Sequence, residues 1–164
     1  MIVISDTSVL SGLIKIQRLS LLKDIFSEII IPPAVQSELK ELKRFGFDLS
    51  AFEDASWVII KEPADSSQVG KFEQVLDRGE AEAITLAIEL KADFLLLDEK
   101  KGRSIAEMEG LTVVGLAGIL IRAKQLSLIP EVKPLLDDLV KHNFRISKAL
   151  YEVVLKRAGE ETAE

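Results

Sequence analysis

The chain contains no cysteine among its 164 residues. Disulfide bonds, thiolate catalysis and cysteine-ligated zinc are therefore excluded. Histidine occurs only once, as His142, which weakens any mechanism that depends on a catalytic histidine. No apolar run is long enough to span a bilayer, and no basic segment typical of a signal peptide precedes the first strand-like residues. We therefore expect a cytoplasmic protein without a membrane partner.

The composition is that of an ordinary globular protein with an excess of acid. Hydrophobic residues make up 48% of the chain, which is enough for one domain with a substantial core. The net charge of −6 argues mildly against a nucleic-acid partner. However, four carboxylates gathered around a cation would account for four of these six negative charges. A local basic rim could then still hold a phosphate backbone.

Short apolar runs alternate with segments of helical periodicity. Strands are predicted at 2–5, 29–31, 57–60, 93–97 and 111–114, helices follow each of them, and residues 44–55 are expected to be irregular. A helical pattern that resumes near Gln68 breaks at Gly79 and restarts at Glu80. This alternation predicts an α/β fold in which helices cover both faces of a mainly parallel sheet.

The predicted organisation is a single domain over residues 1–164. Its core covers 1–125, a helical extension covers 126–158, and a frayed acidic tail covers 159–164. Helices are expected at 132–141 and 147–157, each with an apolar stripe. Those stripes either complete the core or form a surface for a second subunit or a partner helix.

Four acidic residues stand where a strand ends or a helix begins: Asp6, Glu38, Glu80 and Asp98. In an open parallel sheet such positions gather at the carboxyl ends of the strands. Carboxylates forced together repel one another unless a cation neutralises them, and all-oxygen sites suit Mg²⁺ or Mn²⁺. The pattern therefore predicts a metal-dependent enzyme that acts on phosphate esters.

Each acid also has a local explanation. Asp6 could cap the following helix, and Glu80 lies in a first helical turn, where a carboxylate is favoured. Glu82 and Glu99 share these explanations and compete for the same roles. Only the joint placement of the four acids at one edge of the sheet favours function.

Cleavage of a phosphodiester needs a polarised phosphoryl group, an activated water and a stabilised leaving oxygen. One or two divalent ions, about 4 Å apart in two-metal sites, can supply all three. Asp6 and Asp98 are the predicted direct ligands of the metal, and Glu80 is predicted to ligate a metal or orient its water. Glu38 is expected to act through bound water or as a base.

Several short motifs resemble the PIN domain, the nuclease fold of many prokaryotic ribonuclease toxins. The opening Ile4-Ser5-Asp6-Thr7-Ser8 is similar to the start of that domain, and Leu95-Leu96-Leu97-Asp98 is similar to its last acidic motif. The segments 31–35, 79–84 and 97–103 resemble one largely uncharacterised PIN-like subfamily of predicted nucleic-acid-binding proteins. The resemblance covers residues 1 to about 125 well.

The resemblance implies a three-layer α/β/α fold and a Mg²⁺- or Mn²⁺-dependent endoribonuclease. It also implies the toxin of a toxin–antitoxin pair, with a small antitoxin protein as partner and a homodimer as the assembly. The four acids match the family's acidic positions, although many relatives have Asp where this chain has Glu80. Ser8 resembles the hydroxyl residue that supports the first acid. Candidate phosphate contacts are Lys40, Lys100 and Arg103.

Other α/β classes fit less well. A haloacid-dehalogenase-type phosphatase would have a second Asp where this chain has Ser8, and a receiver domain would have paired acids where Asp6 is followed by Thr7. A dinucleotide-binding turn would need more glycine than the single Gly12 of residues 5–12. A PIN-like domain retained as a binding module with weak or no catalysis remains the non-enzymatic alternative.

Overall fold

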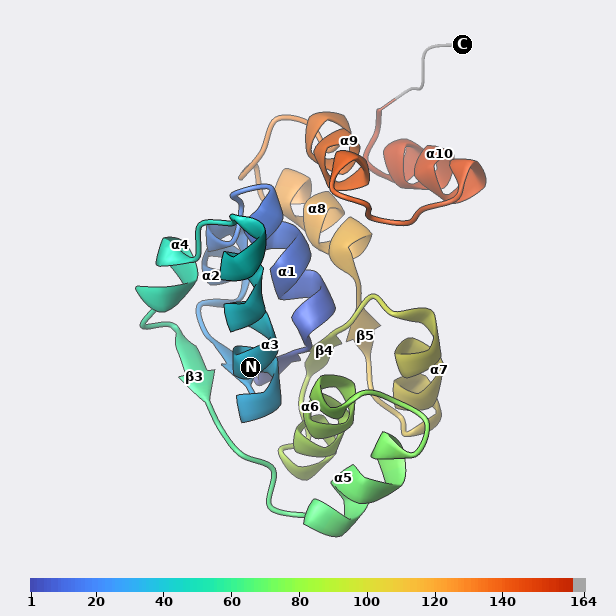
Figure 1. Ribbon diagram of the computed structural model, residues 1–164. Helices are drawn as coiled ribbons and strands as arrows, with labels where there is room; N and C mark the ends of the chain where they lie inside the picture. The colour runs from blue at the N-terminus through green and yellow to red at the C-terminus, as the bar shows by residue number, and fades with distance from the viewer. Residues whose placement is uncertain (161–164) are drawn as a thin grey trace.

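The computed structural model describes residues 1–160 and shows a central sheet of five parallel strands (Figure 1). The strands are β1 (Val3–Ser5), β2 (Ile29–Ile31), β3 (Val58–Ile60), β4 (Phe94–Leu96) and β5 (Val113–Val114). Their order across the sheet is β3-β2-β1-β4-β5. The chain therefore moves outward from β1 to one edge and returns to build the other. β1 and β4 lie side by side, and all carboxyl ends share one edge.

Alternating side chains along the strands separate two hydrophobic cores. Val3 and Leu96 face one core, whereas Ile4 and Leu95 face the other. Helices α1 (Thr7–Lys15), α2 (Ser20–Phe26), α8 (Leu116–Gln125) and α9 (Lys133–Lys141) pack against the first core. Helices α5 (Ser66–Glu73), α6 (Arg78–Glu89) and α7 (Lys100–Met108) pack against the second. The predicted α/β/α fold with a parallel sheet is confirmed.

The predicted strands and most of the predicted helices are present. The helices are α1 (Thr7–Lys15), α2 (Ser20–Phe26), α3 (Pro33–Lys40), α4 (Ser50–Glu53), α5 (Ser66–Glu73), α6 (Arg78–Glu89), α7 (Lys100–Met108), α8 (Leu116–Gln125), α9 (Lys133–Lys141) and α10 (Lys148–Arg157). None of those within residues 1–160 is both long and apolar enough to cross a membrane.

Two local predictions are wrong. Residues 44–55 are not wholly irregular, because a 3₁₀ helix η1 (Glu41–Phe45) extends α3 and α4 packs Phe52 into the core. Gly79 is not a break between helices. It lies inside the first turn of α6, because Asp77 is the residue that caps this helix.

The extension after α8 is largely part of the core. The apolar stripe of α9 is buried, with Leu136 and Leu139 no more than 1% exposed. On α10, Val154 and Leu155 are buried, but Leu150 and Val153 are about half exposed, at 51% and 49%. In Figure 1 these two helices, orange and red, lie beyond α8 at one end of the molecule.

The end of the described chain is anchored by Glu160. Its carboxylate accepts hydrogen bonds from the backbone N–H groups of Val132 (2.7 Å) and Lys133 (2.9 Å), and an ion pair from Lys124 (3.0 Å). These bonds satisfy N–H groups at the start of α9 and lower the pKa of Glu160 despite its burial. The predicted fraying is therefore wrong for Gly159 and Glu160; the rest of that predicted tail, 161–164, lies outside the described residues.

Glu160→Ala should loosen the packing of α9 and α10. The substitution leaves two helix-start N–H groups and one ammonium without their acceptor, which should cost about 1–3 kcal/mol. Urea unfolding measures the loss. Glu152→Ala, on the exposed surface of α10, is the control and should change the midpoint little. Equal midpoints for the two variants would show that the Glu160 carboxylate anchors nothing.

Candidate metal centre

The parallel pairing of β1 with β4 brings Asp6 and Asp98 to the same sheet edge. Ser5 is opposite Leu96, and the N–H of Asp6 donates to the Leu96 carbonyl (2.9 Å). The Ser8 hydroxyl joins the two strand ends, since it accepts from the Asp98 N–H (3.1 Å) and donates to Asp6 Oδ2 (3.3 Å). Ser8 therefore fixes one acid against the backbone of the other.

Asp6 is both a helix cap and a buried carboxylate with unused capacity. Its Oδ2 accepts from the Ser8 N–H (3.5 Å) at the start of α1. The residue is 3% exposed, and Oδ1 has no hydrogen-bond partner within residues 1–160. A buried oxygen without a donor is costly, so capping alone does not account for this side chain.

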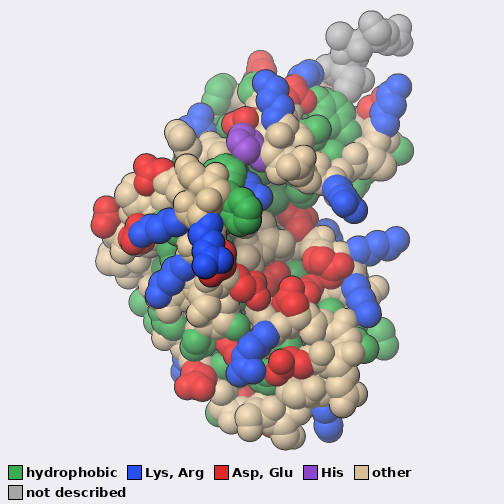
Figure 2. Space-filling model, viewed as in Figure 1, with side chains coloured by type: hydrophobic (Ala, Val, Ile, Leu, Met, Phe, Trp, Pro, Cys, Tyr) green, Lys and Arg blue, Asp and Glu red, His purple; other side chains and the backbone are tan. Residues whose placement is uncertain are grey.

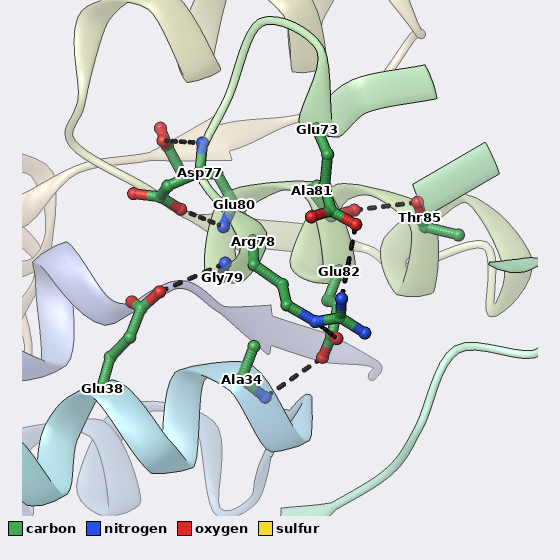
Figure 3. A network of polar contacts seen from close by, with 10 residues as sticks. All are labelled: Ala34, Glu38, Glu73, Asp77, Arg78, Gly79, Glu80, Ala81, Glu82 and Thr85. Atoms are coloured by element: carbon green, nitrogen blue, oxygen red, sulfur yellow. Dashed lines mark hydrogen bonds and ion pairs between the residues drawn. The ribbon is translucent and has the colours of Figure 1, made fainter. Parts of the chain in front are cut away.

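Glu38 reaches the same edge from α3. Its two oxygens accept from the Thr7 hydroxyl and from the Gly79 N–H (3.2 Å). Figure 3 shows the Glu38 side chain extending from its helix to the first turn of α6. A methyl group on Gly79 would come within 2.6 Å of Glu38 Oε1, so only glycine permits this approach.

The third acid of the group is Asp77, which the sequence analysis did not single out. Asp6, Glu38 and Asp77 each offer one carboxylate oxygen, and these three oxygens lie within 4.8 Å of one another. Asp77 caps α6 by accepting from the Glu80 N–H (2.8 Å), and Glu80 Oε1 accepts from the Asp77 N–H (3.4 Å). This reciprocal capping box has a sequence signature, Asp77-x-x-Glu80, which could have located the residue.

Glu80 and Asp98 flank these three acids. Glu80 is buried at 6% exposure, and its Oε2 has no hydrogen-bond partner among the described residues. That oxygen points toward Gly102, where a methyl group would approach to 2.5 Å. Asp98 Oδ2 accepts from the Leu116 N–H (2.9 Å) at the start of α8. The direct ligation by Glu80 and Asp98 that the sequence suggests stays a prediction.

The other acidic candidates occupy structural positions. Glu82 accepts from the Ala34 N–H (3.1 Å) and from Arg78 Nε (2.9 Å), so it ties the start of α3 to α6 (Figure 3). Glu99 is exposed and caps α7 by accepting from the Gly102 N–H (2.9 Å). Both therefore position helices that carry the site.

The basic candidates separate into two places. Lys40 is exposed near the end of α3, two residues after Glu38. Lys100 and Arg103 lie on α7 and line a surface groove that begins at Asp98. Figure 2 shows acidic side chains gathered at the centre of this face, with Lys and Arg around them.

Burial and mutual repulsion favour the protonated form of the clustered acids. Burial, then the nearby carboxylates Asp77 and Glu38, raises the pKa of Asp6 to about 7. Burial, together with the adjacent Glu99 and Asp77, raises the pKa of Glu80 to about 9. Burial also raises the pKa of Glu38 and of Asp98. A metal-free cluster therefore holds protons that a bound cation would displace.

The residues present fit a divalent cation. Three carboxylate oxygens converge, two buried oxygens have no donor in the described part of the chain, and every candidate ligand atom is oxygen. Such a hard-ligand set suits Mg²⁺ or Mn²⁺ better than the softer transition metals. A structural explanation of the acids through helix capping leaves Asp6 Oδ1 and Glu80 Oε2 unexplained.

Comparison with known proteins gives one family. The model of the PIN-domain family matches residues 2–160. Among solved structures, the chain is similar to a PilT N-terminus domain protein from the hyperthermophilic archaeon Sulfolobus solfataricus P2. The two share 20% identity with a TM-score of 0.48, over 90% of this chain and 100% of the other. No protein of curated function matches the chain.

The metal-free protein should lose stability as the pH rises toward neutrality. Between the ordinary pKa of Asp6, 3.8, and its raised value of about 7, the folded protein holds a proton that the unfolded chain has released. The free energy of unfolding therefore falls across this window, by at most about 1.4 kcal/mol per pH unit for this group. Thermal melts in EDTA between about pH 5 and about pH 7 measure the slope.

Mn²⁺ should reverse that trend, because the cation binds the ionised acids. At about 100 times its dissociation constant it should stabilise the fold by roughly 2.7 kcal/mol. Asp6→Asn should weaken both the pH dependence in EDTA and the stabilisation by Mn²⁺. Asp24→Asn, at an exposed position of α2, should leave both unchanged. A melting midpoint that ignores Mn²⁺ throughout the pH range would rule out a cation site here.

Two glycine-to-alanine substitutions separate site geometry from helix stability. Gly79→Ala forces a methyl group against Glu38 and should weaken Mn²⁺ binding roughly 10- to 100-fold. Gly70→Ala in α5 meets no atom within 4 Å and should stabilise the helix by up to about 1 kcal/mol. Calorimetric titration should show reduced affinity only in the first variant; equal affinities would remove Glu38 from the site.

Proposed function

Because this chain belongs to the PIN-domain family, we propose that it is a metal-dependent endoribonuclease and the toxin of a toxin–antitoxin pair. The resemblance that its short motifs suggested is confirmed over residues 2–160. The family gives a nuclease-type fold, and the chain carries the acidic cluster that such chemistry needs. The choice of RNA as substrate and the toxin role are the proposal.

One observation carries the catalytic part of the proposal. Oxygens of Asp6, Glu38 and Asp77 lie within 4.8 Å of one another, and Asp6 Oδ1 is buried without a donor within residues 1–160. These three side chains would hold a Mg²⁺ or Mn²⁺ ion. Glu80 and Asp98, beside them, are the remaining candidates for direct or water-mediated ligation.

Bound in this cluster, a divalent ion would supply Lewis-acid polarisation of the phosphoryl group and an activated water. The protein's own contribution is positioning. Ser8 and the Leu116 N–H hold Asp98, while Thr7 and Gly79 hold Glu38. Because no histidine lies in the cluster, proton transfer falls to carboxylates and water. In the metal-free protein, burial and then the adjacent Glu99 and Asp77 raise the pKa of Glu80 to about 9, so Glu80 holds a proton at neutral pH that a bound cation would displace.

The toxin role and its partners rest on the resemblance of the motifs to ribonuclease toxins. A small antitoxin protein and a homodimer are the partners proposed. Most of the apolar stripe of α9 is used inside the fold. Among the apolar residues of α9 and α10, those that remain exposed are chiefly Val140, Leu150 and Val153.

Asp6→Asn and Asp77→Asn should each remove a ligand without changing the shape of the side chain. We expect cleavage of single-stranded RNA in Mg²⁺ or Mn²⁺ to fall at least about 100-fold in kcat, and EDTA to abolish it. Asp24→Asn is the matched control and should cleave as wild type does. Gel analysis of an end-labelled oligoribonucleotide measures the rates.

Unchanged rates in both site variants would show that the cluster is not catalytic. RNA binding without cleavage by the wild-type protein would favour the binding-module alternative. Growth arrest on expression, lost in the same two variants, tests the toxin role separately. If the protein cleaves RNA but neither arrests growth nor binds the product of a neighbouring gene, the nuclease function stands and the toxin role is rejected.

A further inference from the structure

A groove of about 730 Å³ runs from the acidic cluster along the C-terminal extension. It starts at Asp98 and lies between α7 on one side and α10 with the loop before it on the other. Figure 2 shows the corresponding hollow, with Lys and Arg side chains on both rims. Its volume falls within the range of true ligand sites, and Gly115 and Gly118 are among its lining residues.

The groove is locally positive in an acidic protein. Four cations line it: Lys100 and Arg103 on the α7 wall, Arg145 in the loop before α10, and Arg157 at the end of that helix. The carboxylates in the lining are Asp98 and Glu107. None of the four cations forms an ion pair with any acid among residues 1–160. Their charges therefore remain available to a ligand.

At one end of the groove, the cation Arg103 lies near Asp98, one of the candidate site acids. A methyl group on Gly115 would lie 3.1 Å from Arg103 Nη1 and even closer to Asp98 Oδ1, so both side chains border that glycine. Arg103 accordingly opposes the rise in the pKa of Asp98. A polyanion lying in the groove would thus have one of its anionic groups delivered to the acidic cluster.

We propose that this groove binds the sugar–phosphate backbone of single-stranded RNA beside the scissile bond, with Arg145 and Arg157 as phosphate contacts on the far wall. Phe144 lines the same wall and offers a ring on which an unpaired base can stack. Cations along a groove with an aromatic side chain are the combination that single strands use. A docked apolar helix fits less well, because it would desolvate four cations that have no ion-pair partner among residues 1–160.

The inference rests on the proposed function, since it assigns a path to the substrate of that site. It also gives the extension a role: α9 and Glu160 hold α10 in place, and α10 holds one wall of the groove. The phosphate contacts predicted from the sequence are only Lys40, Lys100 and Arg103. Arg145 and Arg157 lie more than forty residues further along the chain, and only the fold brings them opposite α7.

The test compares the double variant Arg145→Ala/Arg157→Ala with a charge-matched control, Arg18→Ala/Lys23→Ala. The control residues are exposed, Arg18 in the loop between α1 and α2 and Lys23 in α2, and line no part of the groove. Fluorescence anisotropy with a labelled single-stranded oligoribonucleotide in EDTA measures binding without cleavage. The groove variant should bind roughly tenfold more weakly at low salt, and its salt slope should be shallower by about 1.4.

Kinetics in Mg²⁺ provide a second readout. The groove variant should raise KM and leave kcat within about twofold, as expected when uniform substrate binding is lost. Equal RNA affinity and equal KM in the two double variants would overturn the inference, even if the enzyme is active. So would a groove variant that binds RNA normally but loses self-association or a protein partner. Groove-dependent binding by a protein that never cleaves would sustain the inference while the proposed nuclease function failed.

Discussion

Repulsion among carboxylates held close together at a partly buried edge of the sheet is the constraint on which this structure depends. Asp6, Glu38, Asp77, Glu80 and Asp98 come from four separate segments, since Asp77 and Glu80 both belong to the start of α6. Oxygens of the first three lie within 4.8 Å of one another. Their neighbours are N–H and hydroxyl donors rather than cations, apart from Arg103 beside Asp98. Donors orient each acid but do not cancel its charge. Protons or a metal ion must do so. Burial first, and neighbouring carboxylates second, raise the pKa values of Asp6, Glu38 and Glu80.

The fold could be predicted from the sequence because strand and helix periods alternate cleanly. Asp6 and Asp98 directly follow buried strands, so the parallel pairing of β1 with β4 brought them together as expected. Helix boundaries were harder to predict from the sequence. The sequence pattern predicts that the helical segment breaks at Gly79. In the structure, the capping box of Asp77 and Glu80 starts α6 at Arg78, one residue before that glycine. Asp77 was missed for the same reason, since it was assigned to no element.

The burial of side chains shows which apolar stripes belong to the core, a question that the sequence pattern leaves open. The stripes of α9 and α10 have similar periodicity, yet α9 is largely inside the core and α10 leaves Leu150 and Val153 exposed. Nothing in the spacing distinguishes them, because exposure depends on where α8 places the following chain. Glu160 is a comparable case. An acid near the end of a polar tail looks solvated, and only the uncapped start of α9 explains its burial.

Three glycines stand behind the acids, each at a point where a methyl group would strike a carboxylate: Gly79 behind Glu38, Gly102 behind Glu80, and Gly115 behind Asp98. The acidic cluster therefore requires that these three positions carry no side chain. A related sequence that keeps every acid but places larger residues at these positions would have to turn its carboxylates elsewhere. Such glycines are a criterion for separating working members of a family from those that retain only the motif.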